Sequence, residues 1–135
     1  MPTFDNATAD AAEAREALRG LAHATRNLGD PRDLYAVLGD LSLAAASLSQ
    51  VLHQLGRLHD NPQSATVWVA EESRAGRAAA YQVSWDLHRA GEMLRQVARC
   101  IDEAHQSEGT LVYHHRDFPA FAETAPPARD RGLGL

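Results

Sequence analysis

Apolar residues recur at alternating spacings of three and four through the middle of this chain. This recurrence averages 3.5 residues, the period that keeps one stripe of an α-helix turned toward a partner helix. The first stripe is Leu34, Leu38, Leu41, Ala45, Leu48, Leu52, Leu55 and His59. The second stripe is Ala80, Val83, Leu87, Ala90, Leu94, Val97, Ile101 and Ala104. The sequence therefore predicts an all-α, antiparallel three-helix bundle with coiled-coil-like seams, or a four-helix bundle if the third helix is split.

Capping and helix-breaking residues set the expected ends of the first two helices. The first helix is predicted from about Thr8 to Leu28, with Gly29 adopting the left-handed conformation that stops it. The second is predicted from Pro31 to about Leu58, because Asp30 is a good cap and proline is favoured in the first turn.

The third helix is predicted from Pro62 to about Gln106, bent or interrupted near Gly76, with Gly109 as its terminator. The prolines and glycines that follow cannot continue a helix. We therefore divide the chain into a helical bundle domain (1–109) and an extended or flexible carboxy-terminal tail (110–135). No internal repeat is expected beyond the two stripes.

The second helix carries no charged residue from Leu41 to Gly56, which is unusual for a helix at a protein surface. The third helix, at 1.5 Å per residue, is also too long to be covered by the second. Both features favour contact with another helix, either in a second copy of the chain or in another helical protein. The candidate interface residues are Leu43, Val51, Tyr81 and Trp85. Leu48→Asp is expected to unfold the bundle or to cost several kcal/mol, because it buries an unpaired carboxylate.

Composition narrows the classes of function. The net charge of −5 disfavours a nucleic acid as partner. All 13 basic residues are arginine, which excludes Schiff-base chemistry and phosphate-binding lysines. The single cysteine, Cys100, is expected to be a buried thiol in a reducing compartment. No signal peptide is expected, and the serines between Leu41 and Leu52 disfavour a membrane span, so the predicted location is cytoplasmic.

No catalytic residue, metal ligand or cofactor is predicted. A carboxylate-bridged metal pair needs glutamates from facing helices, and none occurs between Glu16 and Glu71. His88 and Glu92 share a helix face and, with the tail histidines His114 and His115, are the nearest approach to a zinc site. A convergent set of three or four ligands does not follow from their spacing.

Two short patterns resemble those of helical enzymes. Glu71-Glu72 resembles the start of the Glu-Glu-x-x-Glu motif of bundle-type nucleotide pyrophosphohydrolases, but Ala75 stands where the third carboxylate belongs. Arg99 and His105 form an Arg-x5-His string that is similar to the signature of HEPN-type ribonucleases, and that resemblance implies a ribonuclease site at these two residues.

A third pattern, Tyr113-x-x-x-Asp117, resembles the export signal of type VII secretion substrates, which are helical hairpins. The Trp-x-Gly turn of that family is missing, because neither Trp68 nor Trp85 has glycine two residues later. The prediction is thus a non-enzymatic helical bundle that acts through helix-mediated association. The alternatives are a small-molecule or metal-binding bundle, a HEPN-like ribonuclease and a type VII secretion-type substrate.

Overall fold

The structure, a computed structural model, describes residues 1–60 and 73–114. Within these ranges it contains helices and no strand, so the all-α prediction is confirmed. The elements are α1 (Ala7–Ala24), a short 3-10 helix η1 (Thr25–Asn27), α2 (Asp33–Arg57) and α3 (Ser73–Glu108).

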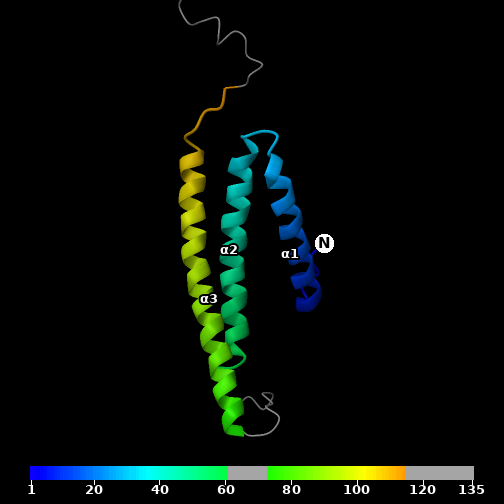
Figure 1. The fold of residues 1–135 in the computed structure, drawn as a ribbon, viewed down its shortest axis with the longest axis vertical. Helices are drawn as coiled ribbons and strands as arrows, with labels where there is room; N and C mark the ends of the chain where they lie inside the picture. The colour runs from blue at the N-terminus through cyan, green and yellow to red at the C-terminus, as the bar shows by residue number, and fades with distance from the viewer. Residues whose placement is uncertain (61–72, 115–135) are drawn as a thin grey trace, which may run out of the picture.

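Helices α2 and α3 run antiparallel, side by side, and α3 extends past the end of α2 (Figure 1). Helix α1 leans away from α2 toward its amino end, as the same figure shows. No Cα atom of α1 comes within 8 Å of α2 or α3 in the described part of the chain, and α1 has no buried residue. The α2–α3 pair is therefore the packed centre of the fold.

The helix ends agree with the predicted ones to within a few residues. Asn6 caps α1, its side-chain oxygen accepting the Ala9 N–H at 3.0 Å, an N-cap that the sequence prediction missed. The prediction that Asp30 caps α2 is wrong: the N-cap residue is Arg32, without a side-chain cap, and the Asp30 carboxylate accepts the Arg32 N–H at 2.9 Å in the turn before the helix. The prediction of a left-handed Gly29 is wrong, because none of the glycines in the described ranges has a positive φ.

The third helix is continuous through Gly76, so the expected break is absent, and it ends directly before Gly109 as predicted. Its predicted start at Pro62 lies outside the described residues, as does the tail from His115 onward. The described part of the tail leaves Leu111 and Val112 exposed.

The buried positions of the seam between α2 and α3 are small residues that belong to neither predicted stripe, and at least half of each stripe is half-buried beside them. Ser49, Gly56, Ser84, Gly91 and Ala98 are buried at this contact, each seven residues from the next on its own helix. Small side chains let two helix backbones approach closely, and Gly91 leaves room for a neighbouring side chain where a Cβ would stand.

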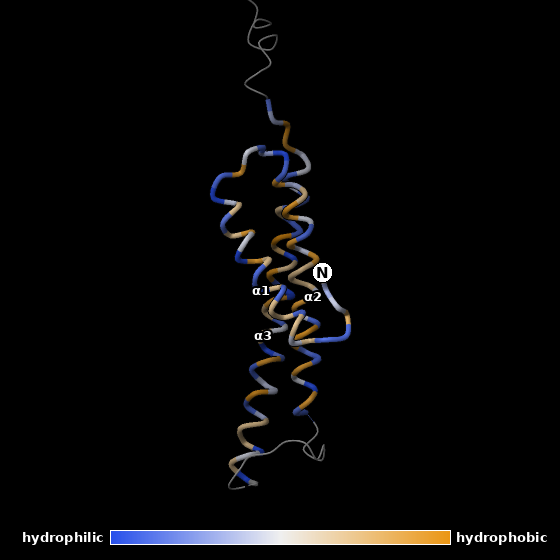
Figure 2. Tube along the Cα trace, turned by 90° about the vertical axis from the view of Figure 1, so that its right-hand side faces the viewer, coloured by the Kyte–Doolittle hydropathy of each residue, from blue (hydrophilic) through white to orange (hydrophobic). Residues whose placement is uncertain are grey.

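This seam is offset by one residue from half of each predicted stripe. Leu48 and Leu55 of α2 are each 43% exposed, and Val83 and Val97 of α3 are 43% and 45% exposed. The prediction that both stripes face a partner helix along their whole length is not met inside the single chain, because α1 does not cover the flanks of the α2–α3 pair in the described residues. Among the described residues no large side chain is fully buried. Figure 2 shows apolar residues spread along both helices of the pair.

Candidate functional site

One edge of the α2–α3 pair is apolar along its length. The residue directly before each small seam residue points to the same edge on both helices, because the helices are antiparallel. We call this surface the apolar edge. Its residues are Leu48 and Leu55 of α2 and Val83, Ala90 and Val97 of α3, which directly precede the seam residues, together with Leu34, Leu41 and Ala104 at the same seven-residue spacing. The edge is uncharged, with a row of large leucines on α2 and a row of smaller valines and alanines on α3.

A shallow hollow beside the apolar edge joins the two helices. It is lined by Leu38 of α2 and by six residues of α3: Met93, Gln96, Val97, Cys100, Ile101 and Ala104. The prediction that Cys100 is buried is wrong, since its thiol is exposed at this hollow. The cysteine lies next to Ile101 of the second predicted stripe, but its side chain turns outward from the helix pair.

The opposite edge carries a histidine from each helix. His53 of α2 and His88 of α3 meet through their Nδ1 atoms, which are 2.8 Å apart. Each ring lies over a glycine of the other helix. A Cβ built on Gly91 would be 2.8 Å from the His53 ring, and one built on Gly56 would be 2.9 Å from the His88 ring. The two glycines therefore make the space in which the histidines meet.

A repeated sequence produces this symmetric arrangement. Residues 44–56 and 79–91 share the pattern Ala-Ala-x-x-(Leu/Val)-Ser-x-x-Leu-His-x-x-Gly, with the two histidines 35 residues apart. The sequence prediction of no internal repeat is wrong. His53, which that prediction did not single out, could have been found from this repeat.

Carboxylates lie on the outer side of both rings. The Nε2 atom of His88 is 3.0 Å from Asp60 Oδ2, and the Nε2 atom of His53 is 3.7 Å from Glu92 Oε1. The Ser84 hydroxyl also donates to Asp60. This hydroxyl, and then the His88 ring, hold the pKa of Asp60 below its ordinary value of 3.8.

The four candidate interface residues are exposed, but they do not share one surface. Val51 lies on the side of α2 that borders the apolar edge, whereas Leu43 lies on the opposite side of the helix. Tyr81 and Trp85 line a hollow on α3 with Ser84 and His88, on the histidine side. Trp85 also packs under the guanidinium of Arg89, 5.2 Å from the ring centroid.

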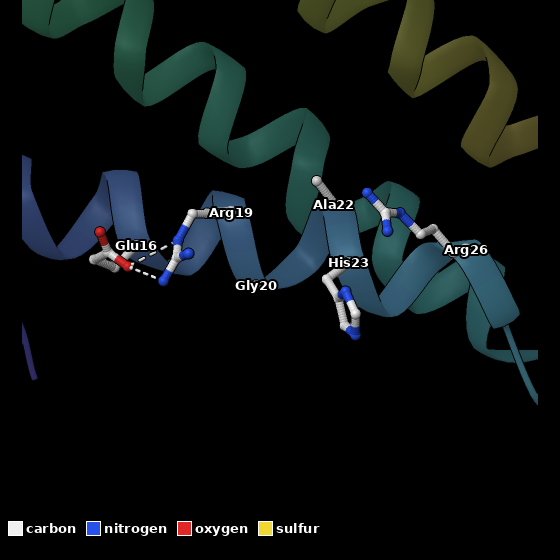
Figure 3. Close-up of a pocket in the computed structure, with 6 residues that line it drawn as sticks. All are labelled: Glu16, Arg19, Gly20, Ala22, His23 and Arg26. Atoms are coloured by element: carbon white, nitrogen blue, oxygen red, sulfur yellow. Dashed lines mark hydrogen bonds and ion pairs between the residues drawn. The ribbon is translucent and has the colours of Figure 1, made fainter.

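Helix α1 has a hollow of its own, which Figure 3 shows in close-up. Its lining comes from α1 and the adjoining 3-10 turn: Glu16, Arg19, Gly20, Ala22, His23 and Arg26. Glu16 and Arg19 form an ion pair at 2.9 Å across one helical turn. The side chains of His23 and Arg26 point in different directions, so they do not converge on one point.

Arg99 and His105, the two residues of the ribonuclease-like pattern, are not in contact in the described structure. His105 stacks on Tyr35 with ring centroids 4.1 Å apart, while Arg99 is exposed. Glu71 and Glu72 lie outside the described residues. In residues 1–60 and 73–114, no group of three or more His, Cys, Asp or Glu side chains is placed to hold a metal ion.

Of the export-signal pattern, only Tyr113 is described, and Asp117 lies outside the described residues. The Tyr113 hydroxyl donates to Glu108 at the end of α3, and this hydrogen bond raises the pKa of the tyrosine. The tyrosine is thereby tied to the helix that precedes it.

Comparison with known proteins finds no relative: no protein-family model, curated protein or solved structure matches the chain significantly. By length and composition alone, one helix in the described ranges is apolar enough to cross a membrane, and it is α2. The apolar edge and the edge that carries His53 and His88, the histidine edge, are the two candidate functional surfaces of the described residues.

Proposed function

We propose that this chain is a non-enzymatic association module, and that two copies pair through their apolar edges into a four-helix bundle. The observation that supports this most is the unfinished core of the single chain. In the described residues, the one buried apolar residue is Ala98, while large apolar side chains stay partly exposed on both long helices. A helix pair with so little buried apolar surface gains its stability by covering that surface.

The size of the apolar edge suits a stable dimer. The 25 residues of α2 span about 37 Å, and two helices packed 8–10 Å apart present a face about 20 Å wide. The resulting area, about 700 Å² per copy, is close to the roughly 800 Å² per partner of a standard protein interface.

The two rows of the apolar edge fit each other. With a two-fold axis parallel to the helices, α2 of one copy lies antiparallel to α3 of the other. The leucine row around Leu48 then packs against the shallow row around Ala90, large side chains against small ones. Because neither row carries a charge, the pairing leaves no ion unpaired. A second copy therefore fits this edge better than a charged partner does.

Light scattering after size exclusion tests the proposal on the full chain over a range of concentrations. We expect twice the mass of the chain for the wild type, and a monomer for Leu48→Asp. Leu43→Asp makes the same chemical change on the other side of α2, where the exposed fraction is 69%, and is expected to remain dimeric. A monomeric wild type at high concentration, or a monomeric Leu43→Asp with a dimeric Leu48→Asp, would contradict the pairing.

The native cysteine gives a second readout. Cys100 lies in the hollow beside the apolar edge, so the dimer shields it. We expect a maleimide to react with this thiol more slowly in the wild type than in Leu48→Asp. Equal rates in both proteins would place Cys100, and the hollow around it, outside the contact.

A membrane is the second candidate partner, because α2 is long and apolar enough to span one. In that case α2 has to separate from α3, whose outer faces carry charges such as Arg89, Arg95 and Asp102. Flotation of the chain with neutral and anionic lipid vesicles tests this. Co-flotation with either vesicle would favour the membrane, and we expect the chain to stay in the unbound fraction.

A further inference from the structure

The histidine edge forms a directed chain of hydrogen bonds. The Nε2–H of His88 donates to Asp60, so a neutral His88 ring has a bare Nδ1 that accepts a hydrogen bond. The facing Nδ1 of His53, 2.8 Å away, must then carry the hydrogen and donate it. The order His53 to His88 to Asp60 satisfies three of the four ring nitrogens.

The fourth ring nitrogen has room for one added proton. The Nε2 atom of His53 points toward Glu92, with 3.7 Å between the nitrogen and the carboxylate oxygen. A proton that binds there makes His53 a cation beside a carboxylate and leaves the bond between the two rings intact. The pair therefore accepts one positive charge without losing any contact.

A second added proton has only one place to bind, Nδ1 of His88. Two N–H groups would then face each other across 2.8 Å, and both rings would be positively charged. We propose that His53 and His88 form an acid-sensitive latch on the α2–α3 pair, closed while the rings carry at most one added proton and opened when both become imidazolium.

Among the described residues, the other charges around the latch come from α2, α3 and the turn that follows α2. Arg57 is the last residue of α2, and its charge acts on Asp60, which lies three residues later. On α3 they are Glu92 and Arg95, which form an ion pair at 2.9 Å. Each carboxylate thus serves one ring from outside, and neither lies between the two Nδ1 atoms to relieve their repulsion. The latch is on the edge opposite the apolar edge, so it does not depend on the proposed dimer.

The direction of the pH effect follows from counting protons. In acid the unfolded chain binds both protons freely, whereas the closed pair resists the second. The unfolded state then binds more protons than the folded one, so stability falls as the pH falls. Histidine changes its charge between about pH 8 and pH 5, and the loss is expected in that range.

Thermal melting of the full chain between pH 7.5 and pH 5 tests the latch. We expect the wild-type Tm to fall on the order of 5 °C more than the Tm of His53→Gln over this range. A glutamine keeps a hydrogen-bonding group over Gly91 but adds no charge. His23→Gln alters an exposed histidine on α1, away from the packed pair, and is expected to follow the wild type. The same pH dependence in all three proteins would overturn the proposal.

Nitrogen-15 NMR of the wild-type imidazoles keeps the test decisive if His53→Gln does not fold. We expect a scalar coupling across the hydrogen bond between the Nδ1 atoms of His53 and His88 at pH 7.5, and the loss of this coupling at pH 5. No coupling at pH 7.5, or a coupling that persists at pH 5, would overturn the latch. A rise in Tm on adding Zn²⁺ at pH 7, present in the wild type and absent in His53→Gln, would assign the pair to a metal ion and overturn it as well.

Discussion

The Ser49 hydroxyl of α2 donates a hydrogen bond to the Gly91 carbonyl of α3 at 2.6 Å. Both residues are buried, and the bond runs from a side chain of one helix to the backbone of the other. A weaker copy of this arrangement lies two turns away, where the Ser42 hydroxyl reaches the Ala98 carbonyl at 3.3 Å. These bonds set how far the two helices can slide past each other.

Removing the Ser49 hydroxyl should therefore weaken the pair. Ser49→Ala fits the same space but loses the bond, and we expect the free energy of unfolding to fall by about 1 kcal/mol. Urea unfolding of the full chain measures this. Ser47→Ala, at an exposed position of the same helix, is the matched control and should change stability by less than about 0.5 kcal/mol. Equal effects at both positions would contradict a role for the interhelical bond.

A methyl group at Gly91 should destabilise the chain in spite of its better helix propensity. The new Cβ would lie 2.8 Å from the His53 ring, so the ring has to move out of its place. We expect Gly91→Ala to cost about 1–3 kcal/mol from overpacking, more than the roughly 1 kcal/mol that alanine gains in a helix. Chemical denaturation gives the net value.

Gly20→Ala is the control for that substitution, because nothing lies within 4 Å of the Cβ it would add. Here the propensity gain acts alone, and the helical signal in far-ultraviolet circular dichroism should rise. A Gly91→Ala protein that is more stable than the wild type would contradict the close packing of His53 against α3.

Asp60 should contribute to stability above about pH 4 and lose this contribution in stronger acid. Its pKa is lower in the folded chain than its ordinary value of 3.8, because Ser84 donates to it and His88 lies against it. The stabilisation is present above the unfolded pKa and disappears as the pH falls through the lower, folded pKa. We therefore expect the stability difference between the wild type and Asp60→Asn to be smaller at pH 3 than at pH 5.

Unfolding by urea at a series of pH values from 3 to 7 measures that difference. Asp40→Asn, at an exposed position on α2, serves as the control. A difference between the wild type and Asp60→Asn that stays constant down to pH 3 would show that the Ser84 and His88 contacts do not stabilise the carboxylate.

The helix ends could be predicted because their signals are local. Asp30 and Pro31 lie in the turn that precedes α2, whose first residue is Asp33, and Gly109 follows the last residue of α3, with no help from distant parts of the chain. The extent of α3 near Gly76 was less predictable, since a single glycine costs a long helix only about 1 kcal/mol.

The face of contact between the helices could not be predicted from apolar content. The spacing of the leucines predicts a leucine seam, but a close helix pair buries residues such as Ser49 and Gly91 and leaves Leu48 and Leu55 at its flank. A stripe of large residues shows where burial is favourable, whereas a stripe of small ones shows where backbones meet. The contact between His53 and His88 depends on the stripe of small residues, so the pattern of large apolar residues does not predict it.

The shared pattern on α2 and α3 has a consequence for the ancestry of the chain. A single helix that paired antiparallel with its own copy would already place each histidine over the other's glycine. Duplication of that one segment, followed by fusion, would be enough to create the hairpin. Asp60 and Glu92, which occupy different places relative to the two glycines, would then mark where the halves diverged.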